Sequence, residues 1–254
     1  MKNLYKQLAV AALIASLSVL VQAQNLAGHW TFEEGSGDTS ADQSGNKNNL
    51  SIFNATNGGL NDGSFWHTDA DRGAVASFGG EGNDAYALAD NEIPVMTLKQ
   101  DFTWAFWAND LSEGEPNNII FGNRYDLTLA EFSPRQFIKF TPTKFEWHMN
   151  SNWNDDLEYG PDDPAANDIP NGEWMHHAVV KNGPTLTYYR NGAAQNSADI
   201  TQPLTEPQPL FIGGDNEGKG KKNWRGLIDD VRIYDGAISA AAVAELAQPQ
   251  TNKK

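Results

Sequence analysis

Short segments in which Trp, Phe, Tyr, Ile and Val alternate with polar residues limit the folds open to this chain. Clusters of Gly, Asn, Asp and Pro separate the segments, and helical periodicity is nearly absent after residue 23. Such alternation is typical of β-strands with one buried face. About a dozen strands need two stacked sheets, so the sequence predicts an all-β sandwich. The expected strands are Gly28–Glu33, Asn48–Ile52, Ala74–Phe78, Ala85–Leu88, Phe102–Trp107, Asn118–Phe121, Phe137–Phe140, Lys144–Met149, Met175–Lys181, Thr185–Arg190, Leu210–Gly213 and Gly226–Tyr234.

One short helix is expected near the C-terminus. Ser239 can cap the segment AAAVAELA, and Pro249 can prevent its continuation. Residues 248–254 are polar and are expected to form a flexible tail. Residues 150–170 contain three prolines and many acids, and the sequence predicts a long loop there.

The first 23 residues have the pattern of a secretory signal peptide. Lys2 and Lys6 precede the apolar segment Leu8–Val21, and cleavage is expected after Ala23. The apolar segment is shorter than the ~20 residues that a membrane-spanning helix needs, so we expect no transmembrane segment. The sequence therefore predicts an exported protein, either secreted or periplasmic. With no cysteine, the fold must be stabilised by its core and not by disulfides.

The charge of the mature chain excludes one class of partner. Loss of Lys2 and Lys6 leaves 16 of the 18 basic residues against 33 acidic residues, a net charge of −17. This field repels nucleic acid, attracts divalent cations and favours solubility. No linker or repeat divides residues 24–247, which we expect to form one domain and a monomer.

Four segments, taken in order, resemble a known family. They are HWTFEEGSGDTSADQSGNKNNL at 29–50, DFTWAFWAN at 101–109, GEWMHHAVVKNGPTLTYYRNGA at 172–193 and FIGGDNEGKGKKNWRGLIDDVRIYDGAIS at 211–239. Together they are similar to the LamG-like, concanavalin A-like domains of exported bacterial proteins. The resemblance implies an antiparallel, two-sheet jelly roll with one short C-terminal helix. Trp174 and His176 match the family's W-x-H motif, and Tyr189 and Gly192 match a strand end followed by a tight turn. Arg190 departs from the family, which has a small apolar residue there, and it leaves open whether this strand faces the core or a groove.

The same resemblance implies a structural calcium site where the last strand returns beside the first. Asp229 and Asp230 lie in an otherwise apolar strand pattern, and adjacent strand residues point to opposite faces unless a bulge re-aims one of them. Calcium prefers oxygen ligands. The expected ligands are Asp42, Asp230, Asp38 and Asn48. The alternative is that the segment DQSGN is an Asp/Gly turn held by its own side chains.

Aromatic residues suggest a carbohydrate partner, because Trp and Tyr rings stack on sugar rings. Trp30, Trp104, Trp107 and Trp174 lie in strand patterns and are expected in the core, whereas Trp66, Trp153 and Trp224 have polar neighbours and are expected to be exposed. The sequence thus predicts a lectin-like domain that binds a polysaccharide in a concave groove. The predicted groove residues are Arg124, His148, Trp153, Tyr188, Arg190 and Trp224. If Arg124, Arg135, Lys139 and Arg190 share that groove, the polysaccharide is anionic.

Two other functions stay open from the sequence. The glucanase pattern Glu-x-Asp-x-x-Glu is absent, but a polysaccharide lyase needs only a base, an acid and a cation, for which His148, Tyr188 and Arg190 are candidates. A protein-interaction module of the cell envelope would instead present a flat apolar patch. The fold alone does not choose among these functions.

Overall fold

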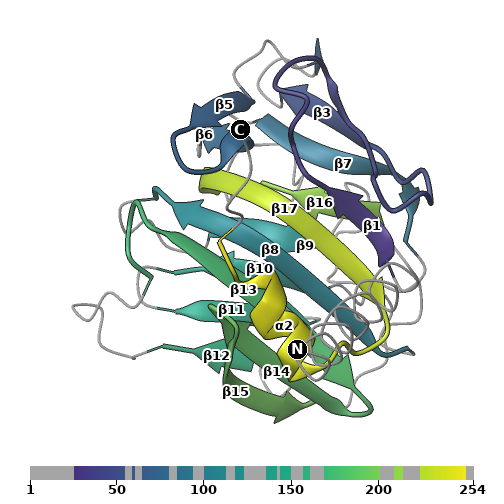
Figure 1. Cartoon of the computed structure of the whole chain (residues 1–254), viewed down its shortest axis with the longest axis vertical. Coiled ribbons are helices and arrows are strands. Elements are labelled where there is room, and N and C mark those ends of the chain that lie inside the picture. The colour runs from purple at the N-terminus through teal and green to yellow at the C-terminus, as the bar shows by residue number, and fades with distance from the viewer. Residues whose placement is uncertain are drawn as a thin grey trace, which may run out of the picture.

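Two antiparallel β-sheets stack face to face in the computed structural model of this chain (Figure 1). The structure describes residues 26–54, 59–60, 65–79, 85–93, 100–112, 118–122, 136–141, 144–149, 157–160, 169–200, 209–213 and 224–249. The predicted jelly-roll sandwich is confirmed. Its core fills the space between the sheets, where Trp30, Trp104 and Trp147 are completely buried.

Sheet A contains eight strands among the described residues, in the order β15-β14-β13-β8-β17-β6-β5, with β1 paired to β17. Their bounds are β1 Leu26–Trp30, β5 Trp66–Asp69, β6 Gly73–Gly79, β8 Phe102–Asp110, β13 Trp174–Asn182, β14 Thr185–Arg190, β15 Ala193–Asp199 and β17 Arg225–Asp235.

Sheet B contains nine strands in the same described ranges, in the order β12-β11-β10-β9-β16-β7-β3-β2, with β4 paired to β3. Their bounds are β2 Thr39–Ser40, β3 Leu50–Asn54, β4 Gly59–Leu60, β7 Ala85–Glu92, β9 Asn118–Gly122, β10 Gln136–Phe140, β11 Phe145–Met149, β12 Leu157–Tyr159 and β16 Pro209–Ile212.

The last strand returns beside the first, as the resemblance implied. One edge of β17 pairs with β6 up to Ile228 and with β1 from Val231 onward, while the other edge pairs with β8 (Figure 1). Strand β17 therefore lies within sheet A and joins segments from both ends of the chain. Asp229 and Asp230 lie where its neighbour changes from β6 to β1.

The helix α2, Ala240–Leu246, covers part of the outer face of sheet A (Figure 1). Ser239 caps it as predicted, since its side chain accepts a hydrogen bond from the backbone N–H of Ala242. The helix buries Val243 and Leu246 against outward-facing residues of the sheet, among them Tyr234. No helix in the described ranges is long and apolar enough to cross a membrane.

All twelve expected strands are present, but some other strands of the described ranges were not predicted. Strand β15 has the sequence AAQNSAD, with no large apolar residue to mark it, and lies at the edge of sheet A. Strand β12 lies inside the segment 150–170 that was predicted to be a loop. The predicted turn after β14 is confirmed: Asn191 and Gly192 both have positive φ, at 48° and 81°, which suits the tight turn of a two-residue hairpin.

Candidate functional site

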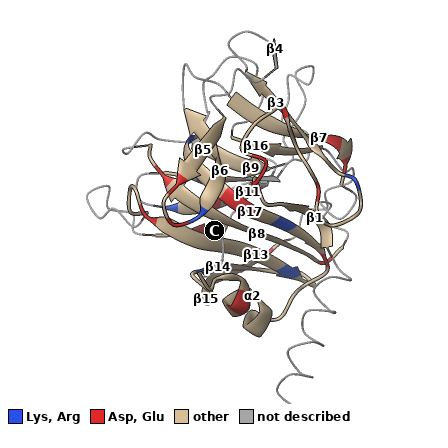
Figure 2. Cartoon of the chain, turned by 45° about the horizontal axis from the view of Figure 1, so that its top comes forward, with Lys and Arg blue, Asp and Glu red and all other residues tan. Residues whose placement is uncertain are grey.

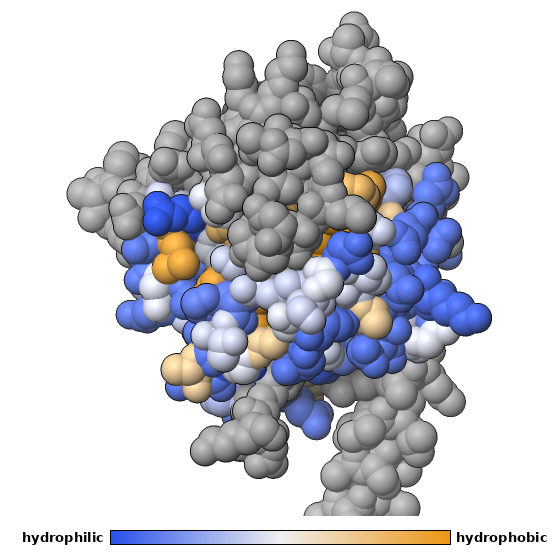
Figure 3. Space-filling view, turned by 90° about the horizontal axis from the view of Figure 1, so that it is seen from above, coloured by the Kyte–Doolittle hydropathy of each residue, from blue (hydrophilic) through white to orange (hydrophobic). Residues whose placement is uncertain are grey.

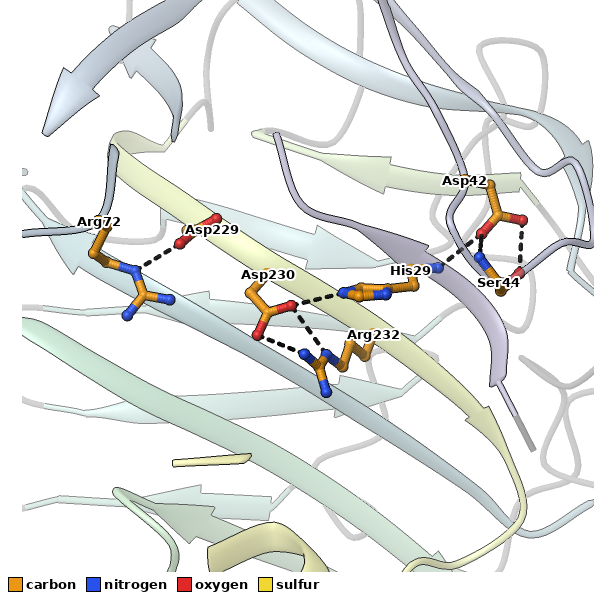
Figure 4. Close-up of polar contacts among 7 residues, drawn as sticks. All are labelled: His29, Asp42, Ser44, Arg72, Asp229, Asp230 and Arg232. Carbon is orange, nitrogen blue, oxygen red and sulfur yellow. Dashed lines mark hydrogen bonds and ion pairs between the residues drawn. The ribbon is translucent and has the colours of Figure 1, made fainter. Parts of the chain in front are cut away.

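Asp229 and Asp230 are both buried, and each is paired with a cation on the outer face of sheet A (Figure 4). The Asp229 carboxylate accepts a hydrogen bond from Arg72 Nε at 2.7 Å. The Asp230 carboxylate accepts two from Arg232 at 3.0 Å and contacts His29 Nε2 at 2.7 Å. Figure 2 shows acidic and basic residues close together along β17. The acids thus connect β17 to the β5–β6 turn and to β1.

A bulge lets two adjacent side chains occupy one face. Asp229 lies opposite Trp107 and Arg232 lies opposite Ala105, so β17 has one residue more than β8 between these positions. Asp230 adopts a φ of 52°, a left-handed conformation that Asp tolerates better than most residues. The sequence indicated that adjacent acids can share a face only where a bulge re-aims one of them, and β17 has a bulge at this position.

Burial by itself would raise the pKa of Asp230, but the hydrogen bond from His29 and the positive charge of Arg232 outweigh that effect. They hold the pKa well below the usual value of 3.8, so Asp230 is ionised. Asp230 therefore connects β17 to β1 as a buried, ionised carboxylate with two partners.

The predicted calcium ligands are already occupied by protein donors. Asp42 accepts hydrogen bonds from the backbone N–H groups of His29, Ser44 and Asn48 and from the Ser44 hydroxyl, at 2.8–3.0 Å (Figure 4). Asn48 donates its side-chain amide to Ala27, and Asp38 accepts from the Thr39 hydroxyl at 3.4 Å.

In Figure 4, His29 lies between Asp42 and Asp230, contacting one through its backbone and the other through its ring. Across the described ranges, no group of three or more Asp, Glu, His or Cys side chains is arranged to hold a metal ion. The arrangement fits the alternative of a turn held by its own side chains. Calcium stays a prediction that these contacts do not support.

Tyr188 and Arg190 face the interior of the sandwich, so the expectation that they share a groove with His148 is wrong. The Tyr188 ring is fully buried and stacks on Phe145 with ring centroids 3.7 Å apart. Its hydroxyl contacts His177 Nδ1 at 2.8 Å and accepts a hydrogen bond from Arg190 Nε at 2.9 Å. The Arg190 guanidinium also lies over the ring of Tyr159. Alternation gave the shared face of Tyr188 and Arg190 correctly, but the interior accepts both because the Tyr188 hydroxyl and Arg190 Nε are hydrogen-bonded there.

The basic residues expected in one groove are separated as well. Lys139 faces outward from sheet B, whereas Arg190 faces the interior from sheet A. Arg124 and Arg135 lie outside the described residues, as does Trp153. The stated basis for an anionic polysaccharide, four cations on one face, is therefore not met.

Trp224 is completely buried, contrary to the expectation that it is exposed. Its Nε1 donates a hydrogen bond to Asp110 at 3.0 Å, and its ring packs near Phe78. Trp66 is half-buried and donates to the backbone carbonyl of Gly37 at 2.7 Å. Trp107 and Trp174, which were expected in the core, lie instead on the outer face of sheet A under the guanidinium of Arg72.

Two adjacent histidines on β13 predict how stability depends on pH. Burial lowers the pKa of His176 to about 3 and the pKa of His177 well below 6.5, so both are neutral in the folded protein. The unfolded chain binds more protons below ~6.5, so stability falls as pH drops below that value, by about 2 kcal/mol per histidine at pH ~5. Urea unfolding at pH ~7 and ~5 measures the loss. His177→Gln should reduce it, exposed His67→Gln should not, and an unchanged free energy of unfolding in the wild type would refute this assignment.

Aromatic side chains form a row on three neighbouring strands of sheet B, on the side away from the core; two are half-buried and Phe211 is 1% exposed. Phe53 of β3 stacks on Tyr86 of β7, which stacks on Phe211 of β16, with ring centroids 5.2 Å apart in both pairs. Their strand neighbours Ile52 and Ala87 belong to the core, so the row points away from it. In backbone register the row continues from Phe211 through β9 and β10 to His148 on β11.

A charged cluster lies on the same outer face, on β10 and β11, and strand β9 separates it from the aromatic row. The Glu146 carboxylate contacts Lys139 Nζ at 2.6 Å and His148 Nε2 at 2.8 Å, and Glu146 and His148 are less than 9% exposed. Burial would raise the pKa of Glu146, but its bonds with His148 and Lys139 lower it overall, so the carboxylate is ionised. Aromatic rings beside fixed donors and acceptors are the usual lining of sites for small polar ligands. We define Phe53, Tyr86, Phe211, Lys139, Glu146 and His148 as the sheet B site.

Sequence reasoning identified His148 and the outward direction of Glu146 but missed the aromatic row. A signal was available in β7, where Ala85, Ala87 and Ala89 alternate with the larger Tyr86 and Leu88. A strand usually places its large apolar residues toward the core. Strand β7 places small residues inward and large residues outward, which indicates that its outer face is in contact with a ligand or with another part of the protein.

The sequence pattern of one family agrees with this fold. A sequence model of the concanavalin A-like lectin/glucanases superfamily, Laminin_G_3, matches residues 80–244. The chain belongs to this superfamily. A comparison of this concanavalin A-like chain with curated protein sequences found no match.

Three solved structures illustrate proteins with the same fold. Domain 4 of AbnA, an extracellular arabinanase from Geobacillus stearothermophilus in complex with arabinotriose, is 17% identical with a TM-score of 0.63, over 88% of this chain and 98% of that one. The botulinum neurotoxin serotype D ligand-binding domain in complex with N-acetylneuraminic acid is 12% identical with a TM-score of 0.66, over 92% and 53%. The binding domain of Paraclostridial Mosquitocidal Protein 1 is 18% identical with a TM-score of 0.62, over 89% and 52%. The chain thus spans about half the length of the toxin domains it matches.

Proposed function

We propose that this concanavalin A-like chain is an exported, lectin-like domain that binds a polysaccharide or other glycan on the outer face of sheet B. The observation that carries the proposal is the sheet B site, where an aromatic row on β3, β7 and β16 shares the outer face with the fixed Lys139–Glu146–His148 cluster on β10 and β11. Sugar rings have apolar faces that stack on aromatic rings and hydroxyls that both donate and accept hydrogen bonds. A glycan therefore matches both parts of the site.

The relatives of known structure support the same class of ligand. One was solved with arabinotriose and another with N-acetylneuraminic acid, which are a neutral and an acidic saccharide. The sheet B site contains one lysine and one glutamate in contact, so its charges largely cancel. A glycan screen for this protein should therefore include neutral and acidic saccharides in equal number.

A glycan array tests the proposal, followed by titration of the strongest hit. Tyr86→Ala should weaken binding by about tenfold or more, equivalent to about 1.4 kcal/mol, because it removes the central ring of the row. Tyr189 is a matched control: it is also half-buried, but it packs near α2 on sheet A, so Tyr189→Ala should leave the affinity unchanged. Equal affinities for wild type and Tyr86→Ala, in a folded variant, would refute the site.

A polysaccharide lyase is a second candidate, favoured by the contact between His148 Nε2 and Glu146. A carboxylate that holds an imidazole can orient it as a general base. Tyr188 cannot be the acid of such a site because its hydroxyl is buried in the interior. Incubation with acidic polysaccharides and detection of an unsaturated product by ultraviolet absorbance separates the two functions. Product that disappears in His148→Ala would favour the lyase.

An interaction module would present a broad apolar patch instead. Among the described residues visible in Figure 3, hydrophobic residues form small separate groups among hydrophilic ones.

A further inference from the structure

A cavity lies on the opposite side of the molecule from the sheet B site. It has a volume of about 540 Å³, and its lining comes from the β5–β6 turn, strands β8 and β13, the turn after β14 and the C-terminal segment that follows α2. The residues used below are Asp71, Arg72, Trp107, Trp174, Asn191 and Pro249. The volume lies within the ~300–1,000 Å³ typical of small-ligand sites.

Three hydrogen-bond donors around this cavity have no partner among the described residues. They are Arg72 Nη2, Trp107 Nε1 and Trp174 Nε1, and all three atoms are buried. Arg72 and Trp107 are themselves more than nine-tenths buried. Buried N–H groups are nearly always bonded in folded proteins, so three unpaired donors around one cavity point to an acceptor-bearing occupant.

The charges around the cavity favour a neutral occupant over an anion. Arg72 is already neutralised by Asp229, which is fully buried at 2.7 Å from its Nε. Behind them, Arg232 pairs with Asp230, and His176 is neutral because burial lowers its pKa to about 3. Asp71 is exposed and adds a negative charge to the lining. A carboxylate ligand would be repelled by Asp71 and by the net charge of −15 of the chain.

The polar groups of the lining complement hydroxyl groups. A sugar hydroxyl can accept a hydrogen bond from Trp174 or Arg72 and donate one to Asp71, or to the second lone pair of Asn191 Oδ1, which already accepts from the His176 backbone N–H at 2.9 Å. The indoles and Pro249 supply apolar surface for the carbon skeleton. We propose that this cavity is a second binding site, for one neutral saccharide residue, independent of the sheet B site.

Indole N–H signals report directly on this proposal, because two of the unpaired donors belong to tryptophans. In the ¹⁵N-labelled full chain the eight tryptophans give indole cross-peaks that Trp107→Phe and Trp174→Phe assign. The probes are the methyl glycosides of glucose, galactose, arabinose and N-acetylglucosamine, with glucuronate as the charged comparison. For at least one neutral sugar, the Trp107 and Trp174 peaks should shift saturably.

Variants distinguish this site from the sheet B site. Asp71→Ala removes an exposed carboxylate, outside the Arg72–Asp229 pair, and should weaken the sugar about tenfold, as should Trp174→Phe, while Tyr86→Ala should leave the shifts unchanged. Three results would each overturn the proposal: no saturable shift with any neutral sugar, a response to glucuronate alone, or loss of the shifts in Tyr86→Ala. The proposal of a glycan site on sheet B would fail independently, if Tyr86→Ala bound glycans with the affinity of the wild type. The indole signals do not enter that comparison.

Discussion

Asp229→Ala should destabilise the protein by about 3–5 kcal/mol, one of the two largest effects expected from a single substitution. Asp229 is completely buried and is the ion-pair partner of Arg72, which is itself 6% exposed. Its removal leaves a guanidinium buried without its counter-charge at the junction of β6, β17 and β8. Urea unfolding followed by tryptophan fluorescence measures the loss.

Two further variants show whether the loss comes from an unpaired charge. The double variant Arg72→Met with Asp229→Leu removes both charges and should recover much of the stability, because apolar pairs often replace buried ion pairs without loss. Asp235→Ala, at the exposed end of the same strand, should change the free energy of unfolding by less than about 0.5 kcal/mol. A double variant less stable than Asp229→Ala would contradict the account.

Trp224→Ala should cost a similar amount, about 3–5 kcal/mol, because it opens a cavity in the core. The ring is fully buried between Phe78 and Phe140, and its Nε1 donates to Asp110. Burial already raises the pKa of Asp110, and loss of the Trp224 hydrogen bond removes one of the effects that oppose the rise. Thermal unfolding at neutral pH measures the change.

Trp224→Phe separates packing from hydrogen bonding, since it keeps an aromatic ring but loses the donor. Its cost should be about 1–3 kcal/mol, clearly below that of the alanine variant. Trp66→Ala is a comparison on a half-buried indole and should also cost less than Trp224→Ala. If Trp224→Ala left stability unchanged, the residue would be exposed, as its polar sequence neighbours suggested.

Alternation predicted the sandwich because most strands have one face in a continuous core. The segment FTWAFWA shows how far this goes: Phe102, Trp104 and Phe106 belong to the core, while Trp107 faces outward. The sequence pattern could not show that Trp107 lies outside the core. An indole that is covered by an arginine side chain is as buried as an indole in the core, and both occur in the same apolar strand pattern. Strand β15 escaped prediction because pairing at a sheet edge requires no large apolar side chains.

The site was less predictable than the fold because it depends on which layer each strand joins. Tyr188 and His148 each alternate regularly, yet one faces the interior and the other faces outward from the opposite sheet. Similarly, the acids Asp229 and Asp230 stood out in the sequence, but their partners His29 and Arg72 lie more than 150 residues away. Pairs so distant along the chain leave no local pattern.

A crystal structure with the glycan that binds most strongly tests the central claim most directly. We expect one sugar ring of the glycan within about 4 Å of the Tyr86 ring, with hydroxyls of other sugar residues farther along the glycan in hydrogen-bond reach of Glu146 or His148. Glycan bound only elsewhere on the molecule, with the outer face of sheet B unoccupied, would contradict the claim.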